Sequence, residues 1–273
     1  MTTIAKTVIA TGASSGLSFE VIKQLLEQAQ PYKFILGAKD TMKTKEVFNV
    51  LELYSSTHSL TVLPLELSDL NSVKTFAQKM DSNRRHEAEL HWYEAYAVNH
   101  LSQHYLVHTL RNELVASWSR IVVVSSGAVR QVSDAAALDD NLKGGSGADE
   151  RTIYTETKFA QLLGAHWGRR QLAGACTVVV VSPGLIPNTG IGRNVGITLT
   201  MDMPDTKTVP EGAASILRAF TRDDFPEDLE QIFSTSWSEW WSKDIYEKSL
   251  HKKPQDKWCL SKEEIEKEEG ISA

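Results

Sequence analysis

Short apolar runs rich in β-branched residues alternate along this chain with longer segments of helical periodicity, and this alternation limits the fold more than any other sequence feature. The apolar runs occupy residues 6–12, 33–38, 60–67, 120–126 and 176–182. Runs without polar alternation are typical of parallel strands that are buried on both faces. Apolar residues at helical spacing mark residues 17–28, 72–80, 93–114 and 155–172. The repeated order of strand then helix predicts an α/β fold, a doubly wound parallel sheet with helices on both faces.

The length and charge of the chain exclude several classes of protein. Its 273 residues suit one domain over residues 1–273, in which residues 225–273 form a C-terminal extension on the substrate side or pack against the sheet. A net charge of -6 with scattered basic residues argues against a nucleic-acid partner. We find no pattern of a signal peptide or membrane span, so we expect a cytoplasmic protein. Cys176 and Cys259 are too few for a disulfide framework and show no metal-ligand spacing, so we expect no metal.

A glycine-rich turn, TGASSGLS at residues 11–18, joins the first apolar run to the first helix. Gly12 and Gly16 let the backbone turn tightly and approach a ligand, while the helix N-terminus presents N–H groups to a negative charge. Such turns also serve ordinary strand-to-helix connections. The position after the first strand of an α/β chain favours a pyrophosphate site.

The second apolar run ends in GAKD, where a dinucleotide fold selects between a ribose 2′-hydroxyl and a 2′-phosphate. An acidic residue at this point accepts from the hydroxyl and repels the phosphate. Ala38 occupies that position and Lys39 follows it, which favours NADP(H) over NAD(H). Asp40 weakens the argument, and the alternative is that Lys39 is merely solvated.

Tyr154 and Lys158 are four residues apart at the start of a predicted helix, so their side chains share one face. An ammonium beside a phenol lowers the pKa of the phenol and makes it a proton donor or acceptor near neutral pH. Pairs at this spacing are most often surface pairs. Ser125 and Ser126 add weight, because they end the preceding strand and open α/β sheets bind ligands at that edge.

These segments together resemble the short-chain dehydrogenase/reductase family: TGASSGLS, YTETK, the serines after RIVVV, and VSPGLIPNTGI. The resemblance covers residues 5–220 of the chain. GLIPNTGIGRN and the long stretch between Ser126 and Tyr154 further resemble its retinol-dehydrogenase and protochlorophyllide-reductase-like branch, in a form common among fungal enzymes. The resemblance implies a Rossmann-like dinucleotide-binding domain that acts on a small-molecule substrate.

The resemblance also implies a role for each matching residue. Tyr154 protonates a carbonyl oxygen as hydride arrives from the nicotinamide, and Lys158 holds the ribose and depresses the pKa of the tyrosine. Ser126, with Ser125 as the fallback, hydrogen-bonds the substrate oxygen. Asn99 holds a water on a proton path from the lysine to solvent. The remaining matches line NADP(H): Gly12, Ser14, Gly16 and Leu17 at the pyrophosphate, Lys39 at the 2′-phosphate, Glu66 and Leu67 at the adenine, and Pro183, Gly184, Ile186 and Thr189 at the nicotinamide.

The chain departs from the family in residues 76–100, FAQKMDSNRRHEAELHWYEAYAVNH, which hold no apolar run before AYAV. Family members place a strand ending in an Asn-Asn-Ala-Gly motif here, beside the first strand. We therefore expect a sheet that is one central strand short. The loss would remove several ladder hydrogen bonds worth about 1 kcal/mol each and leave their buried partners unpaired at about 1–3 kcal/mol apiece. Two milder departures are Ser18 in place of a third glycine and Glu66 in place of an aspartate.

Three explanations of the missing strand stay open. The first and fifth strands of the family order close directly against each other, or the sequence is a defective gene prediction or splice form that lacks a short coding segment. In the third explanation the chain is a degenerate member kept for binding or for a non-redox step.

The sequence predicts an NADPH-dependent reductase of a carbonyl or activated alkene in a small apolar molecule, placed in secondary metabolism by analogy alone. The alternative is a non-redox or non-catalytic dinucleotide-fold protein. Trp237, Trp240 and Trp241 either cover a substrate entrance or pack against the sheet. The family often pairs the helices at 93–114 and 155–172 between two copies, which makes a homodimer one option.

Overall fold

The computed structural model describes residues 4–51, 57–79, 92–187, 189 and 199–271. Its strands are β1 (Lys6–Thr11), β2 (Tyr32–Ala38), β3 (Ser59–Pro64), β4 (Arg120–Val124), β5 (Thr177–Val181) and β6 (Phe233–Ser234). Its α-helices are α1 (Gly16–Leu26), α2 (Thr41–Asn49), α3 (Leu70–Lys79), α4 (Glu94–Tyr96), α5 (Ser102–Thr109), α6 (Arg111–Ala116), α7 (Leu138–Asn141), α8 (Glu150–Gln171), α9 (Val209–Thr221), α10 (Lys252–Trp258) and α11 (Lys262–Glu268). The shorter turns are a π-helical segment, η1 (Ala97–Leu101), and the 3-10 segments η2 (Gly127–Gln131), η3 (Ala135–Ala137) and η4 (Lys243–Leu250).

The strands form two separate parallel sheets rather than one. Within the described part of the chain, one three-stranded sheet has the order β1-β2-β3 and the other the order β4-β5-β6. Val8 lies opposite Phe34 in the first sheet, and Val122 opposite Val179 in the second. The predicted α/β class is confirmed, and all five apolar runs form strands. The closure of β1 directly against β4, one of the three explanations above, does not occur among these residues.

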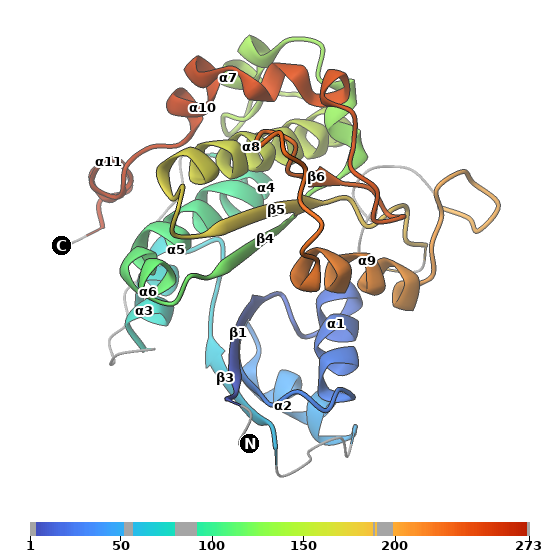
Figure 1. Cartoon of the computed structure of the whole chain (residues 1–273). Helices are drawn as coiled ribbons and strands as arrows, with labels where there is room; N and C mark the ends of the chain where they lie inside the picture. The colour runs from blue at the N-terminus through green and yellow to red at the C-terminus, as the bar shows by residue number, and fades with distance from the viewer. Residues whose placement is uncertain (1–3, 52–56, 80–91, 188, 190–198, 272–273) are drawn as a thin grey trace.

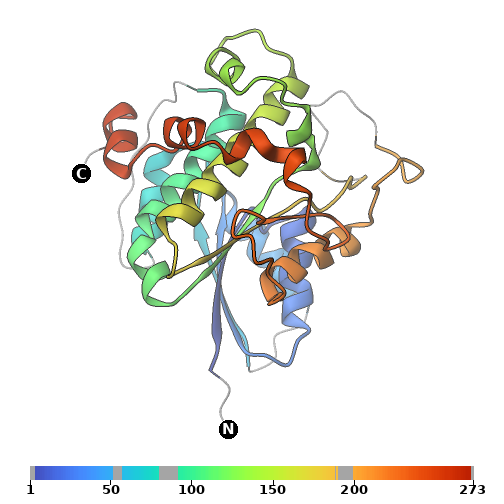
Figure 2. The same cartoon turned by 45° about the horizontal axis from the view of Figure 1, so that its top comes forward.

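Helices cover both faces of the strands, as the alternating pattern predicts (Figures 1 and 2). α5 and α8 lie on one face, where α8 packs against β5 and η1. α1 and α9 pack against each other on the other face. The C-terminal helices add to the first layer, since α10 contacts α8 and α11 contacts α5. Ile265 of α11 is fully buried there, so this part of the chain packs on the domain.

Local sequence signals explain where the functional helices begin. The Asp149 carboxylate accepts a hydrogen bond from the Thr152 backbone N–H at 3.0 Å, so it caps α8. Thr208 and Glu211 form a reciprocal capping box at the start of α9. Asp40 caps α2 by accepting from the Lys43 N–H at 2.9 Å. These caps fix the starts of α8, α9 and α2.

A cavity of about 550 Å³ lies between the two sheets. Residues of β1 from Thr7 onward and the whole of β4 line it, together with residues of α1, α5, α8 and α9. The predicted missing strand would lie in this position. The segment that would have to supply it, residues 80–91, lies outside the described residues, so that prediction stays a prediction. None of the described helices combines the length and the apolar character that crossing a membrane requires.

Candidate active site

Three loops converge at the carboxyl ends of the strands, the edge where open α/β sheets bind ligands. Ser126 follows β4 and begins η2, with its hydroxyl accepting from the Ala128 N–H at 3.2 Å. Pro183 and Gly184 follow β5, and the glycine-rich turn follows β1. Tyr154 and Lys158 reach the same edge from the first turns of α8. The four residues predicted to act in catalysis, Ser126, Tyr154, Lys158 and Asn99, therefore lie in one region.

The Ser126 hydroxyl and the Tyr154 phenol form the centre of this region. Burial raises the pKa of Tyr154, and its hydrogen bond with the Ser126 side chain lowers it by less. The net direction is upward, so the phenol stays protonated at neutral pH. Ser125 is excluded from the same role, because its buried hydroxyl donates to the Lys158 carbonyl oxygen at 3.0 Å. The preference for Ser126 over Ser125 thus has a structural reason.

Burial and the Ser126 hydrogen bond are the causes of the shift in the Tyr154 pKa, and the lowering by Lys158 that their spacing predicts stays a prediction. Lys158 Nζ lies 5.8 Å from the centre of the Tyr154 ring and donates instead to the Val124 carbonyl oxygen at 3.2 Å. Burial lowers the pKa of the Lys158 ammonium to about 8. Helical spacing predicted the shared face correctly but could not show which acceptors the flexible lysine side chain would find.

Gln161 is a functional candidate that the sequence reasoning missed. Its Oε1 accepts from Lys158 Nζ at 3.0 Å, and its Nε2 donates to the Asn99 carbonyl oxygen at 2.6 Å. This amide therefore occupies the bridge between lysine and asparagine that the family resemblance assigns to a water. The Asn99 side chain is engaged elsewhere, donating to Thr157 Oγ1 at 3.0 Å. The signal available in the sequence was a glutamine three residues after the lysine, on the same helical face.

Asn99 lies in the π-helical segment η1, a local irregularity that is frequent at functional sites. The sequence predicted one continuous helix over residues 93–114. The structure divides it into α4, η1, α5 and α6. The irregular turn carries the Asn99 carbonyl that Gln161 binds.

The glycine-rich turn has the geometry of an anion site. Gly12 and Gly16 have left-handed backbone angles, φ +64° and +61°, and open space where a Cβ would lie. Ser15, the N-cap of α1, makes no side-chain cap, and the first turn holds no acidic residue. The N–H groups at this helix end can thus take a phosphate, whose charge the helix dipole favours. Ser14 lies half-buried within the turn.

Lys39 and Glu66, predicted at opposite ends of the adenosine site, contact each other. Lys39 Nζ lies 2.5 Å from a carboxylate oxygen of Glu66, and the lysine side chain is 81% exposed. The hydrogen bond and charge of Glu66 raise the pKa of Lys39. Burial raises the pKa of Glu66, but hydrogen bonds from Lys39 and Ser68 outweigh it and the net shift is downward. Asp40 caps α2, so its carboxylate is not aimed at a 2′-phosphate.

The other predicted cofactor residues contribute through their backbones or through packing. Leu17 and Ile186 are buried in one apolar cluster with Val179 of β5, so their side chains hold the glycine-rich turn against the loop after β5 rather than facing an open site. The Leu67 carbonyl accepts from Ser102 Oγ, which ties the end of β3 to α5. The remaining three lie along the loop after β5: Pro183 is buried, Gly184 adopts φ +90°, and Thr189 Oγ1 donates to the Ile186 carbonyl at 2.9 Å.

The three tryptophans take different positions. Trp241 adjoins the site, because a Cβ on Gly127 would meet its ring at 3.3 Å. The exposed Arg130 lies over the same ring, at 5.8 Å. Trp237 is 57% exposed and stacks with Lys207. Which tryptophan, if any, covers a substrate entrance stays a prediction.

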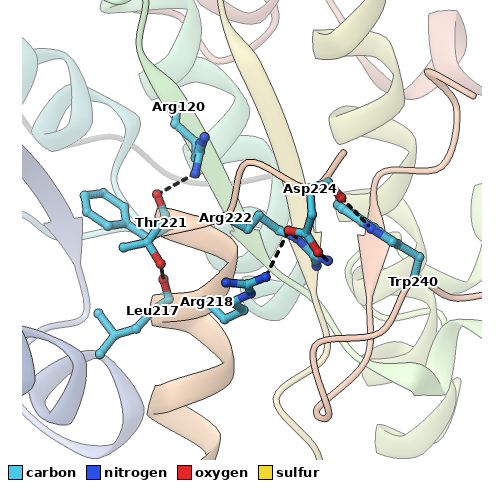
Figure 3. Close-up of polar contacts among 8 residues, drawn as sticks. Arg120, Leu217, Arg218, Thr221, Arg222, Asp224 and Trp240 are labelled. Atoms are coloured by element: carbon cyan, nitrogen blue, oxygen red, sulfur yellow. Dashed lines mark hydrogen bonds and ion pairs between the residues drawn. The ribbon is translucent and has the colours of Figure 1, made fainter. Parts of the chain in front are cut away.

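Trp240 belongs to a separate cluster after α9, which Figure 3 shows. The guanidinium of the fully buried Arg222 lies 3.7 Å from the centre of the Trp240 ring and forms two hydrogen bonds with Asp224. Trp240 Nε1 donates to the Asp224 carbonyl at 3.2 Å. Arg120, at the start of β4, donates to the Phe220 carbonyl at 2.7 Å. This cluster joins the end of α9 to the amino-terminal end of β4, so Trp240 packs and does not cover the site.

Histidines and cysteines in the described ranges do not gather into a metal site. His100 and His104 bind the carbonyls of Trp258 and Leu260, each at 2.9 Å. Burial lowers the pKa of His100 to about 4 and that of His104 well below its usual range, so both rings are neutral. Cys176 and Cys259 are free thiols.

Comparison with known proteins gives both close and distant similarities. The chain is 50% identical to a short-chain dehydrogenase/reductase of Pestalotiopsis microspora over 287 aligned positions, covering 97% of this chain and 99% of that protein. It is 29% identical to human retinol dehydrogenase 14 over 225 positions, covering 71% of this chain and 65% of that protein. The structure of NADPH-bound carbonyl reductase from chicken fatty liver matches with a TM-score of 0.63 at 16% identity, over 87% of this chain and 99% of the other. No family model matches the chain.

The chain belongs to the short-chain dehydrogenase/reductase family, given its identity to the Pestalotiopsis protein over nearly its whole length. The similarity to retinol dehydrogenase 14 agrees with the branch that GLIPNTGIGRN resembles. The chicken structure, at its low identity, supports the Rossmann-like fold alone. The 287 aligned positions exceed the 273 residues of this chain, so at least 14 positions of the Pestalotiopsis protein have no counterpart here.

Proposed function

We propose that this chain is an NADPH-dependent reductase of the carbonyl group, or an activated alkene, of a small apolar organic molecule. The observation that supports the proposal best is the pairing of the Ser126 and Tyr154 hydroxyls at the carboxyl end of β4, with Lys158 one helical turn further along α8. A hydroxyl pair can hold a carbonyl oxygen from two sides. The family and its chicken carbonyl reductase relative in fold agree with this chemistry.

The proton donor in this proposal is Tyr154. Because burial raises the pKa of its phenol, Tyr154 carries its proton at neutral pH. It therefore suits the general acid of a reduction better than the base of an oxidation. The Ser126 hydroxyl donates a hydrogen bond to the same substrate oxygen and orients it. Bound NADPH supplies the hydride, and the residues of this chain supply the proton and the alignment.

The proposed cofactor is NADPH, held across both sheets. The N–H groups of the glycine-rich turn would bind its pyrophosphate, and Lys39 its 2′-phosphate. Lys39 is mobile enough to exchange partners, because its side chain is mostly exposed and bound to Glu66 alone among charged groups that the structure describes. Lys158 would hold the ribose, for which it must exchange the Val124 carbonyl for a ribose hydroxyl.

The proposed substrate is small and apolar. Trp241 lies beside Gly127, directly after Ser126, and stacks on Phe233 with ring centres 5.7 Å apart. An aromatic wall of this kind favours apolar groups next to the reacting carbonyl. A role in secondary metabolism remains an analogy with similar enzymes. The homodimer that the family resemblance offers also stays a prediction.

The rival function is a dinucleotide-fold protein that binds without catalysing. It is favoured by the separation of β1 from β4 in the described chain, because the pyrophosphate turn and the catalytic groups lie on different sheets. Misplacing reacting atoms by about 1 Å can cost on the order of 100-fold in rate. Binding with no turnover would support this rival.

Titration of the tryptophan fluorescence with NADPH and with NADH, followed by turnover on apolar aldehydes and ketones, tests the proposal. We expect saturable binding that favours NADPH, and NADPH-dependent reduction. Tyr154→Phe should abolish the reduction and leave NADPH affinity nearly unchanged. Tyr246→Phe is the matched control, because the buried Tyr246 hydroxyl has no partner in the described structure. Absence of binding by either nucleotide, or full turnover by Tyr154→Phe, would contradict the proposal.

A further inference from the structure

The cavity between the sheets is bounded by two strand edges that run in the same direction. At one end, Thr11 of β1 contacts Gln103 Oε1 at 3.4 Å, one turn along the helix from Asn99. At the same end, Val124 of β4 accepts from Lys158, which Gln161 connects to Asn99. The carboxyl ends of β1 and β4 therefore meet at one end of the cavity.

The hydrogen-bond register identifies which backbone groups face the cavity. The N–H groups of Lys6 and Ser125 donate across to the neighbouring strands, at Pro31 and Val181. Because alternate residues of a strand point their N–H and C=O groups to opposite sides, the groups of the intervening residues point into the cavity. These residues are Thr7, Ile9 and Thr11 on β1, and Arg120, Val122 and Val124 on β4.

Burial agrees with an unpaired edge on β1 and on β4 among the residues that the structure describes. In an open sheet covered by helices, the inner strands are normally the most buried. Here β2 is buried at every position except Lys33, and β5 at every position except Thr177. All five residues of β4 are only half-buried, although four of them are Ile or Val. Ile9, Ala10 and Thr11 of β1 are also half-buried.

The walls of the cavity are mainly apolar on both faces, although Ser18, Asn99, Gln103, Lys158 and Gln161 also belong to the lining. Val21, Ile22 and Leu25 of α1 line one face, with Ile216 and Phe220 of α9. The opposite face is lined by α5 and α8 side chains, including Leu106, Val107, Ala165 and Trp167. The imidazoles that reach this face, His100 and His104, are held neutral by burial. Any occupant must therefore be apolar on two faces and must hydrogen-bond along two edges.

We propose that this cavity binds one extended apolar strand of a separate polypeptide, parallel to both β1 and β4. An extended chain is the group that offers hydrogen-bond donors and acceptors on two opposite edges and side chains on two faces. It would unite the two sheets into one. This inference does not rest on the proposed reductase activity.

The sequence between α3 and α4 supports a strand supplied from outside the chain. By sequence, residues 80–91, MDSNRRHEAELH, contain no run of apolar residues that suits a strand buried on both faces.

The bound strand would also affect the catalytic lysine. Its carboxyl end would lie between Thr11 and Val124, where Lys158 now donates to the Val124 carbonyl. A strand N–H would take over that carbonyl, and the lysine ammonium would be released toward the cofactor edge. The occupant thus couples completion of the sheet to the position of Lys158.

The experiment uses the full chain without nucleotide and an acetylated, amidated peptide of about eight residues, valine and isoleucine flanked by lysine. At about 100 times its dissociation constant, the peptide should raise the melting temperature by about 5–10 °C. Isotope-edited infrared spectra of a ¹³C-labelled peptide should show a strand. The matched control is the same peptide N-methylated at alternate nitrogens, which loses its donors on one edge and should bind about 100-fold more weakly.

A pair of protein variants locates the site. Val107→Trp fills the cavity and should abolish peptide binding, whereas Val50→Trp, on an exposed position after α2, should preserve it. Equal binding of the methylated and unmethylated peptides would overturn the proposal, because it would mean that apolar volume alone is recognised. Absence of any thermal shift would overturn it as well. If the protein is a dimer and the peptide converts it to monomers, the cavity binds a strand of a second copy of this chain. That result would overturn the proposal of a strand from a separate polypeptide.

Discussion

Replacing Gln161 provides a direct test of the contacts that hold Lys158. The Gln161 amide accepts from the lysine at 3.0 Å and donates to the Asn99 carbonyl at 2.6 Å. Gln161→Leu keeps the approximate size of the side chain and removes both bonds. The ammonium then retains the Val124 carbonyl as its acceptor. A hydrogen bond to a charged group is worth about 1.5–3 kcal/mol, and each pKa unit corresponds to about 1.4 kcal/mol.

These magnitudes predict a fall of about 1–2 units in the pKa of Lys158, which burial already lowers to about 8. The sign follows from the charge, since losing an acceptor disfavours the protonated form. Lys158 would then be largely neutral at pH 7.5, and the alkaline limb of NADPH affinity and of turnover would move to lower pH. Gln161→Glu places a carboxylate at the same point and should move the limb to higher pH.

The assay measures NADPH affinity by tryptophan quenching, and reduction of an apolar ketone, from about pH 6 to about pH 10. Gln171→Leu, near the C-terminal end of the same helix, is the control for the general effect of the substitution on α8. Identical pH profiles for Gln161→Leu, Gln161→Glu and the unmodified protein would refute the reasoning, even if all three were less active. A merely structural role for Gln161 would change activity at all pH values alike.

Two further predictions concern the cofactor and stability. Lys39→Ala should weaken NADPH binding about tenfold and leave NADH binding unchanged, whereas Glu66→Gln frees Lys39 and should tighten NADPH binding. Parallel titrations with both nucleotides measure this, and an equal loss of affinity for both would contradict the 2′-phosphate role. Burial lowers the pKa of His166 to about 3, so the unfolded state takes up the proton first and stability falls below pH 6.5. By pH 4.5 this group should lower the free energy of unfolding by about 3 kcal/mol, and His166→Phe should remove this loss. Urea unfolding at pH 7 and 4.5 measures it, and an unchanged loss of stability in the variant would exclude His166 as the source.

The strands were predictable because their sequence signal is strong and local. All five β-branched runs form strands within three residues of their expected ends, whereas β6, with two residues, is too short to carry a pattern. Helix α9 went unrecognised although Thr208 and Glu211 form a capping box, a signal that the sequence contains. The arrangement of the strands into two sheets could not be read from any one segment, because it depends on which strand edges find partners.

The positions of the candidate site residues were predictable from the sequence, and their contacts were less so. Ser126, Tyr154 and Lys158 lie together as expected, since strand order and helical spacing determine backbone position. The acceptors of Lys158 were not predictable, because they are the Val124 carbonyl and the Gln161 amide, which only the folded packing brings near. The Lys39–Glu66 ion pair joins two residues that the sequence assigned to different parts of the cofactor. Side-chain partners across strands are a property of tertiary structure.

The candidate cofactor-binding and catalytic groups lie on different sheets, so the cavity between the sheets matters for function. The glycine-rich turn, Lys39 and Glu66 follow the strands of the first sheet, whereas Ser126 and Gly184 follow those of the second. Helix packing of α1 on α9 and of α3 on α5 holds the two halves together in the described structure. A dinucleotide bound from one half to the other would therefore span the contact between the halves, and its affinity would report how well the halves are aligned.

A strand that fills the cavity would fix that alignment through backbone hydrogen bonds, which are far stiffer in direction than apolar helix contacts. Sheet completion and cofactor binding should consequently reinforce each other, with each tightening the other by the same factor.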